Sequence, residues 1–199
     1  MAGRFPAFLG AKLPASGWPS GRDESGRSKE KEGEIGMQFG KLTQERLGAK
    51  QLVITRSFNA PRDLVVKANT QPEYVRRWLL GPPGWEMPIC EMDLRVGGRY
   101  RWEWSHAESN MRMGLGGEYL ELDLPRRMRV TQAFDDAWDG KQGIIETGFL
   151  EQGAQTVMKL TITYESEEIL ERVMQSPMAS GMEMGYERLE ALLNEMEGK

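Results

Sequence analysis

The stretch CEMDLRVGGRYRWEW, Cys90–Trp104, carries the pattern that decides the fold. On each side of the pair Gly97 and Gly98, apolar residues alternate with charged residues along the chain. A period of two is typical of a strand with one buried face, and glycines between two such runs predict a β-hairpin.

The register of this hairpin is open in the sequence, and it decides which side chains face inward. A two-residue turn would pair Asp93 with Trp102 and turn charged side chains towards the interior. A three-residue loop with a bulge at glycine would pair Leu94 with Trp102 and Met92 with Trp104, and would leave Asp93 in water. We favour the second register, because burying a charge carries a desolvation cost of several kcal/mol.

The same period of two recurs from Trp85 to Tyr164. Glycine, proline, asparagine and aspartate residues separate the alternating segments, and connections this short join antiparallel neighbours. The sequence therefore predicts a six-stranded antiparallel meander with one buried and one solvated face. Its strands are expected at 85–95, 99–106, 116–123, 127–135, 143–151 and 155–164.

Helical patterns flank this meander. A strand at 49–58 is followed by two short helices at 61–70 and 71–80, each with a proline near its start, where a missing N–H does no harm. The segment 177–197 predicts a helix of about 20 residues, or about 30 Å. Glu183 falls on its solvated side, and its buried stripe is formed by Met178, Met182, Gly185, Leu189, Leu192, Leu193 and Met196.

The first 45 residues differ in composition from the rest of the chain. They are rich in glycine, serine, proline and charge, and they cannot bury enough apolar surface to offset their ordering entropy. We expect a disordered N-terminal tail over 1–45 and one folded domain over 46–199. Met1 and Met37 both fit as the natural start.

The overall composition narrows the classes of partner and compartment. A net charge of −4 does not suggest the clustered basic face that nucleic acid requires. No apolar run approaches the roughly 18 residues of a membrane span. Cys90 is the only cysteine, which excludes an internal disulfide and suits a reducing compartment. We predict a cytoplasmic protein without a membrane span or a nucleic-acid partner.

Strand, two short helices, six-stranded meander and long C-terminal helix, in this order, form the helix-grip arrangement of an α+β fold. The chain from about 50 to 196 also resembles the heat-shock-protein-90 ATPase activator homologue-like family of the START/polyketide-cyclase (SRPBCC) superfamily. This resemblance implies a curved antiparallel sheet wrapped around the C-terminal helix, with an apolar cavity between them. It rests on the stretches ITRSFNAPRDLVVKANTQPEYVRRWLLGPPGW, DLRVGGRYRW, GGEYLELDLPRRMRVTQAF and SGMEMGYERLEALL.

The resemblance implies that the chain binds a small hydrophobic ligand, such as a lipid, in this cavity. Two alternatives stay open: a cyclase- or dehydratase-like enzyme steered by Tyr119, Thr147 and Tyr164, and a stress-response protein that regulates a chaperone ATPase. Gly185 is explained either by close packing of a strand or by room for the ligand, since a mid-helix glycine costs about 1 kcal/mol. The predicted ligand-binding residues are Trp78, Trp85, Met92, Trp102, Trp104, Tyr119, Phe134, Phe149, Met158, Leu160, Met178, Met182 and Gly185.

We predict no cofactor, no metal and no catalytic residue. His106 is the only histidine, so a four-ligand Cys/His zinc site is excluded. A general base needs an orienting partner, which the sequence does not place beside His106. Cys90 is interpreted as a small buried hydrophobe, since a reactive thiol needs nearby positive charge. The identity of the ligand, and the choice between monomer and homodimer, stay open.

Overall fold

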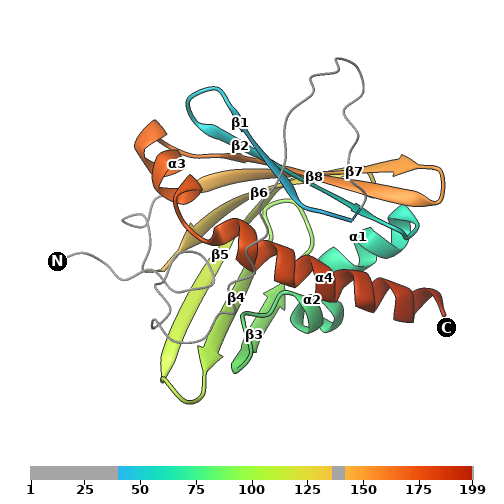
Figure 1. Ribbon diagram of the computed structural model, residues 1–199, viewed down its shortest axis with the longest axis horizontal. Helices are drawn as coiled ribbons and strands as arrows, with labels where there is room; N and C mark the ends of the chain where they lie inside the picture. The colour runs from blue at the N-terminus through green and yellow to red at the C-terminus, as the bar shows by residue number, and fades with distance from the viewer. Residues whose placement is uncertain (1–39, 136–141, 199) are drawn as a thin grey trace, which may run out of the picture.

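The computed structural model describes residues 40–135 and 142–198. One antiparallel sheet of eight strands, in the order β1-β2-β8-β7-β6-β5-β4-β3, curls around the long C-terminal helix (Figure 1). The strands are β1 (Thr43–Leu47), β2 (Gln51–Phe58), β3 (Trp85–Met92), β4 (Arg99–His106), β5 (Met111–Asp123), β6 (Arg127–Phe134), β7 (Gly143–Gln152) and β8 (Gln155–Thr163).

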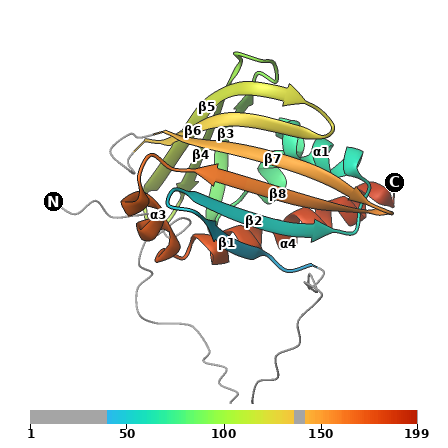
Figure 2. The same cartoon turned by 90° about the horizontal axis from the view of Figure 1, so that it is seen from above.

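Four helices cover the concave face and one end of the sheet. They are α1 (Arg62–Thr70), α2 (Pro72–Trp78), α3 (Glu167–Met174) and α4 (Met178–Glu197). Seen from above, the strands pass over α4, and α1 lies towards the C-terminal end of that helix (Figure 2). The predicted α+β helix-grip fold is confirmed, and the two predicted short helices follow β2.

The chain forms these elements for local reasons that the sequence already contains. Proline begins α2, where its missing N–H costs nothing. The hydroxyl of Ser166 caps α3 by accepting a hydrogen bond from the N–H of Ile169 at 3.3 Å. Alternation along β2 turns Leu52, Ile54 and Phe58 towards α4, and all three are fully buried.

The first strand was not expected. β1 begins at Thr43, before the predicted domain boundary at residue 46, and it pairs with β2. Every residue of this strand is exposed, so its sequence shows no apolar period that could reveal it. The rest of the predicted tail, residues 1–39, lies outside the described residues. β5 also begins earlier than predicted, at Met111 instead of residue 116.

Neither predicted register of the 90–104 hairpin is formed. Met92 is the last residue of β3 and pairs with Tyr100, so the connection is a longer loop over residues 93–98. Gly97 occupies the left-handed region with a φ of +78°, which glycine adopts without steric cost. Its N–H donates to the carbonyl of Tyr119 at 2.8 Å and fastens the loop to β5.

Asp93 and Arg95 lie in solvent, as the favoured register predicts. Their side chains form an ion pair at 2.9 Å, and those side chains are 53% and 70% exposed. We expect the double variant Asp93→Ala/Arg95→Ala to lose no more than about 1 kcal/mol of unfolding free energy in chemical denaturation, because an exposed pair contributes little. A loss of about 3 kcal/mol from Asp93→Ala alone would contradict this placement.

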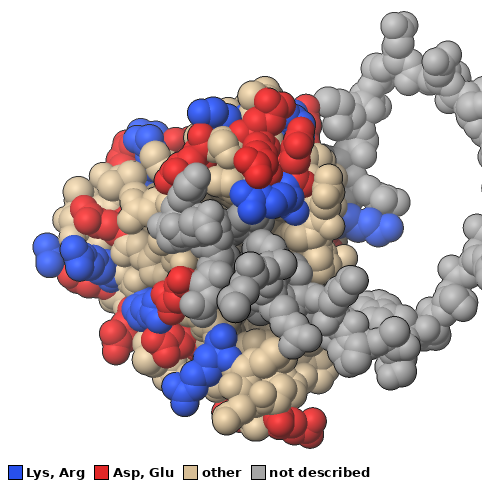
Figure 3. Space-filling view, turned by 90° about the vertical axis from the view of Figure 1, so that its left-hand side faces the viewer, with Lys and Arg blue, Asp and Glu red and all other residues tan. Residues whose placement is uncertain are grey.

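The outer surface carries charges of both signs. On the face shown in Figure 3, basic and acidic side chains are interspersed over the described residues. None of the helices in the described ranges is long and apolar enough to cross a membrane.

Candidate functional site

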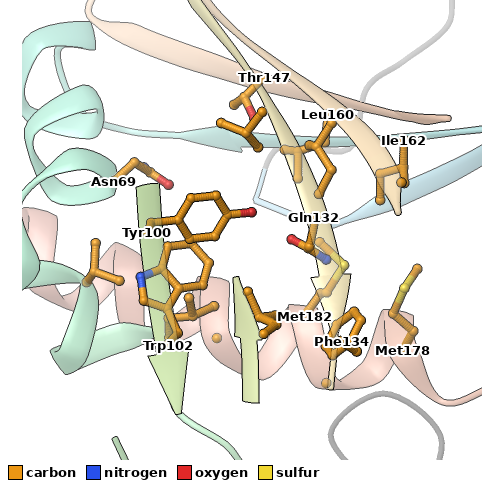
Figure 4. Close-up of a pocket in the computed structure, with 18 of the residues that line it drawn as sticks. Asn69, Tyr100, Trp102, Gln132, Phe134, Thr147, Leu160, Ile162, Met178 and Met182 are labelled. Atoms are coloured by element: carbon orange, nitrogen blue, oxygen red, sulfur yellow. The ribbon is translucent and has the colours of Figure 1, made fainter. Parts of the chain in front are cut away.

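A cavity of about 210 Å³ lies between the concave face of the sheet and α4. Strands β3 to β8 and all four helices contribute to its wall (Figure 4). Except for Trp85 and Phe149, the predicted ligand-binding residues are all part of that wall: Trp78, Met92, Trp102, Trp104, Tyr119, Phe134, Met158, Leu160, Met178, Met182 and Gly185.

Aromatic side chains form one side of the cavity. The indole N–H of Trp78 donates to the carbonyl of Ala68 at 2.9 Å, and that of Trp104 donates to the carbonyl of Leu79 at 2.7 Å. The buried N–H of Trp102 has no hydrogen-bond partner among the described residues. Two of the three indoles are therefore held in fixed orientations by the backbone around α1 and α2.

Gly185 lies where α4 meets both the cavity and α2. A Cβ at this position would lie 3.7 Å from the carbonyl oxygen of Trp78, which is ordinary contact. The glycine therefore packs against α2 and not against a strand, and it also lines the cavity. Tyr186, the next residue, is 3% exposed and belongs to the buried stripe that the sequence predicted without it.

Uncharged polar groups are distributed over this apolar wall. The side chains of Asn69, Gln132 and Thr147 line the cavity and are labelled in Figure 4. Asn69 donates its amide N–H to the carbonyl of Val65 at 2.7 Å, so its own oxygen is free to accept a further bond. The side chain of Gln132 and the hydroxyl of Thr147 have no hydrogen-bond partner in the described ranges.

Three tyrosines add hydroxyl groups to the cavity wall. Tyr100 donates its hydroxyl to the carbonyl of Thr131 at 2.8 Å. Tyr119 and Tyr164 also line the cavity, and their hydroxyls bond to no other described group. Burial raises the pKa of all three phenols far above their usual range. At neutral pH these hydroxyls are therefore protonated and can donate hydrogen bonds.

Charged side chains are scarce in this wall. Among the described residues of the wall, Glu165 is the only one with a carboxyl group, it is exposed, and no lysine, arginine or histidine lines the cavity. A charge inside an apolar cavity is costly unless an opposite charge pairs with it. The electrostatics therefore favour an uncharged occupant over an anion.

Trp85 and Phe149 are buried outside the cavity wall. The ring of Trp85 packs edge-on against the imidazole of His106, with 5.6 Å between their centroids. Phe149 is 1% exposed and belongs to the packed core beside Met158 on the neighbouring strand. Both side chains support the fold and lie away from the proposed site.

Several lining residues were missed that the period of two could have found. Counting back from Phe134 along β6 reaches Gln132, Val130 and Met128, and all of them line the cavity. Counting back from Trp102 reaches Tyr100 in the same way. Other missed residues come from the helices or their ends, where the period of two gives no signal; they are Asn69, Val75, Leu79, Ile169, Val173 and Tyr186.

His106 and Cys90 stand apart from the cavity. The Nδ1 atom of His106 lies 3.0 Å from the hydroxyl of Ser109 and accepts the N–H of that residue at 3.2 Å. Cys90 is buried, and this burial raises the pKa of its thiol although Arg76 acts in the opposite direction. In the described part of the chain, no three His, Cys, Asp or Glu side chains are grouped so as to hold a metal ion.

Comparison with known proteins assigns the chain that forms this cavity to a family. The model of the family described as Activator of Hsp90 ATPase homolog 1-like protein matches residues 59–194, which is more than half of the chain. The chain belongs to this family. The match includes every residue that lines the cavity, and the predicted family is thereby confirmed.

Solved structures share the family's helix-grip fold. A protein from Rhodobacter sphaeroides is 25% identical with a TM-score of 0.72, covering 77% of this chain and 99% of that one. A protein from Mycobacterium smegmatis is 23% identical with a TM-score of 0.66, covering 76% of this chain and 96% of that one. No match was found among the curated proteins.

Proposed function

We propose that this chain binds a small hydrophobic molecule in the cavity between the sheet and α4. The observation that carries the proposal is the cavity itself, with a mainly apolar wall of aliphatic and aromatic side chains. Protein interiors are close-packed and contain few voids larger than a water molecule. An empty space of about 210 Å³ lowers the stability of the folded protein, because the side chains around it lose packing contacts. A bound ligand would restore such contacts.

The volume limits the size of the ligand. An apolar cavity of about 150 Å³ in another protein holds one benzene molecule. A cavity of about 210 Å³ therefore suits one aromatic ring with a short substituent. Membership of a fold family that commonly binds hydrophobic ligands supports the same proposal.

A cyclase- or dehydratase-like enzyme is the second candidate. It is favoured by Tyr119, Thr147 and Tyr164, since all three line the cavity and could orient a bound substrate. Acid–base chemistry would fall to Glu165, because it is the only lining carboxyl group in the described wall. Regulation of a chaperone ATPase is a third candidate, which the family's description alone supports.

Two glycines on β7 provide a direct test of the cavity. Gly143 lines the cavity, whereas Gly148 lies on the opposite face between Arg127 and Lys159. An added Cβ would meet its nearest neighbour at 3.5 Å at Gly143 and at 3.9 Å at Gly148, so both positions accept a side chain.

We expect Gly143→Leu to weaken toluene binding about tenfold or more, which is a loss of about 1.4 kcal/mol, because leucine fills the space that toluene needs. Gly148→Leu should leave the affinity unchanged. Binding is measured by NMR of ¹³C-methyl methionine, since Met158 and Met182 line the cavity and Met111 is exposed as an internal reference. Equal affinities of the two variants, or no toluene binding by the parent, would refute the proposal.

A further inference from the structure

Gln132 is one of the polar residues that line the cavity. It lies on β6, and its amide points into the cavity in Figure 4. Its cross-strand neighbour on β7 is Gly143, which has no side chain to cover or pair with that amide. The amide has no hydrogen-bond partner among the described residues, although it can both donate and accept.

The hydroxyl groups of two largely buried residues repeat this feature at other places in the wall. Tyr119 is 2% exposed and Thr147 is 5% exposed, and both line the cavity. Neither hydroxyl bonds to another described group. Polar groups inside a protein are normally hydrogen-bonded, and a group left without a partner carries a free-energy penalty. These hydroxyls are therefore available to water or to an oxygen-bearing ligand in the cavity.

The charges around the cavity exclude one class of oxygen-bearing ligand. A carboxylate would enter a wall that has no cationic side chain within the described residues, and whose one carboxyl group, that of Glu165, belongs to an exposed residue. It would lose its hydration without gaining a counter-ion. A ketone, an aldehyde or an alcohol loses far less on entering, and it can pair with an amide or a hydroxyl.

We infer that the ligand is an uncharged, single-ring compound with a carbonyl or hydroxyl oxygen, and that the side-chain amide of Gln132 hydrogen-bonds this oxygen. This inference rests on the proposed function, because it names the chemical class that the same cavity selects. It excludes fatty acids and aromatic carboxylates, which the apolar character of the cavity alone would admit.

Three probe molecules of equal size test separately how the shape, the polarity and the charge of a ligand affect its binding. Acetophenone carries a carbonyl, isopropenylbenzene replaces that oxygen with a methylene group, and benzoate carries a charge. Dissociation constants are measured for each by NMR of ¹³C-methyl methionine, with Met158 and Met182 reporting from the cavity. We expect benzoate to bind the parent protein at least about tenfold more weakly than acetophenone, because it has no counter-ion.

The variant Gln132→Leu tests the hydrogen bond. It should weaken the binding of acetophenone about tenfold, in line with the loss of one buried hydrogen bond. The affinity for isopropenylbenzene should be unchanged or higher. Gln132→Val, which favours the strand conformation, provides a second variant should the leucine variant not fold. Thr163→Val is a control for a polar-to-apolar change elsewhere in the sheet, on β8, because Thr163 does not line the cavity.

The outcomes separate this inference from the proposed function. Benzoate binding as tightly as acetophenone would overturn the exclusion of anions and leave hydrophobic binding intact. If Gln132→Leu lowered the affinities for acetophenone and isopropenylbenzene equally, the proposed role of the amide would be overturned. Failure of both uncharged probes to bind the parent protein would overturn the proposed function and this inference together.

Discussion

Replacing Glu183 and Glu190 together with glutamine should lower the free energy of unfolding by about 3–5 kcal/mol. These two carboxylates lie on α4 and face Arg56 of β2, whose side chain is 2% exposed. The guanidinium lies 2.9 Å from a carboxylate oxygen of Glu190 and 3.4 Å from one of Glu183. Without them it would be a buried charge with no counter-charge, because a guanidinium does not lose its proton in proteins.

Arg56 joins the sheet to the helix that closes the cavity. It lies 5.5 Å from the centre of the Phe58 ring, on the face of β2 that packs towards α4. Glu183 also accepts the backbone N–H of Leu42 at 2.8 Å, so one carboxylate ties α4 to the segment before β1. This cluster therefore fixes α4 against the sheet at the first two strands.

A third substitution identifies the cause of the loss. Adding Arg56→Met to the double variant removes the unpaired charge and keeps an apolar side chain of similar length, so most of the lost stability should return. Glu167→Gln is the control, since its ion pair with Arg46 is exposed and should contribute less than about 1 kcal/mol. Urea denaturation measures all four proteins. No recovery in the triple variant would contradict this account.

The sequence predicted the strands that bury every second residue. Met158 and Leu160 on β8, and Trp102 and Trp104 on β4, were assigned to the inner face from alternation alone, and all line the cavity. A period of two specifies the face of a strand wherever one side is buried. This is why the fold and most of the cavity wall could be predicted without coordinates.

The position of Trp85 shows where alternation fails. A bulge shifts the pairing of β3 with β4 between Glu86 and Ile89. Cys90 and Met92 occupy even-numbered positions, whereas the buried residues Trp85 and Met87, before the bulge, occupy odd-numbered positions. Counting by twos through the bulge therefore assigns side chains to the wrong face. Pro88, inside the shifted stretch, is the local sign of the irregularity, because proline within a strand is confined to edges and bulges.

Glu183 shows a different limit. Its helical position falls opposite the buried stripe, so the sequence predicted a solvated side chain. Its partner Arg56 comes from a distant strand, and a pairing between elements far apart in the chain leaves no periodic signal. The same holds for Gln132, since its role depends on the glycine opposite it on β7.

Gly117→Ala should destabilise the fold by about 3 kcal/mol and disturb the aromatic wall of the cavity. An ideal Cβ at Gly117 would lie 1.8 Å from the carbonyl oxygen of Thr131 and 2.8 Å from a ring carbon of Tyr100. The first contact is with backbone, which cannot move aside without shifting β6. Only a residue without a Cβ allows Tyr100 to cross β5 and donate its hydroxyl to Thr131.

Gly143→Ala is the matched control, because its added Cβ would meet no atom closer than 3.5 Å. Replacing this strand glycine should stabilise the fold by about 0.5–1 kcal/mol through the lower entropy of the unfolded chain. Thermal unfolding distinguishes the two variants, and the circular dichroism of the aromatic side chains reports whether Tyr100 and Trp102 keep their packing. If Gly117→Ala unfolds at the temperature of the parent with an unchanged aromatic spectrum, the close approach of β5 to β6 is wrong.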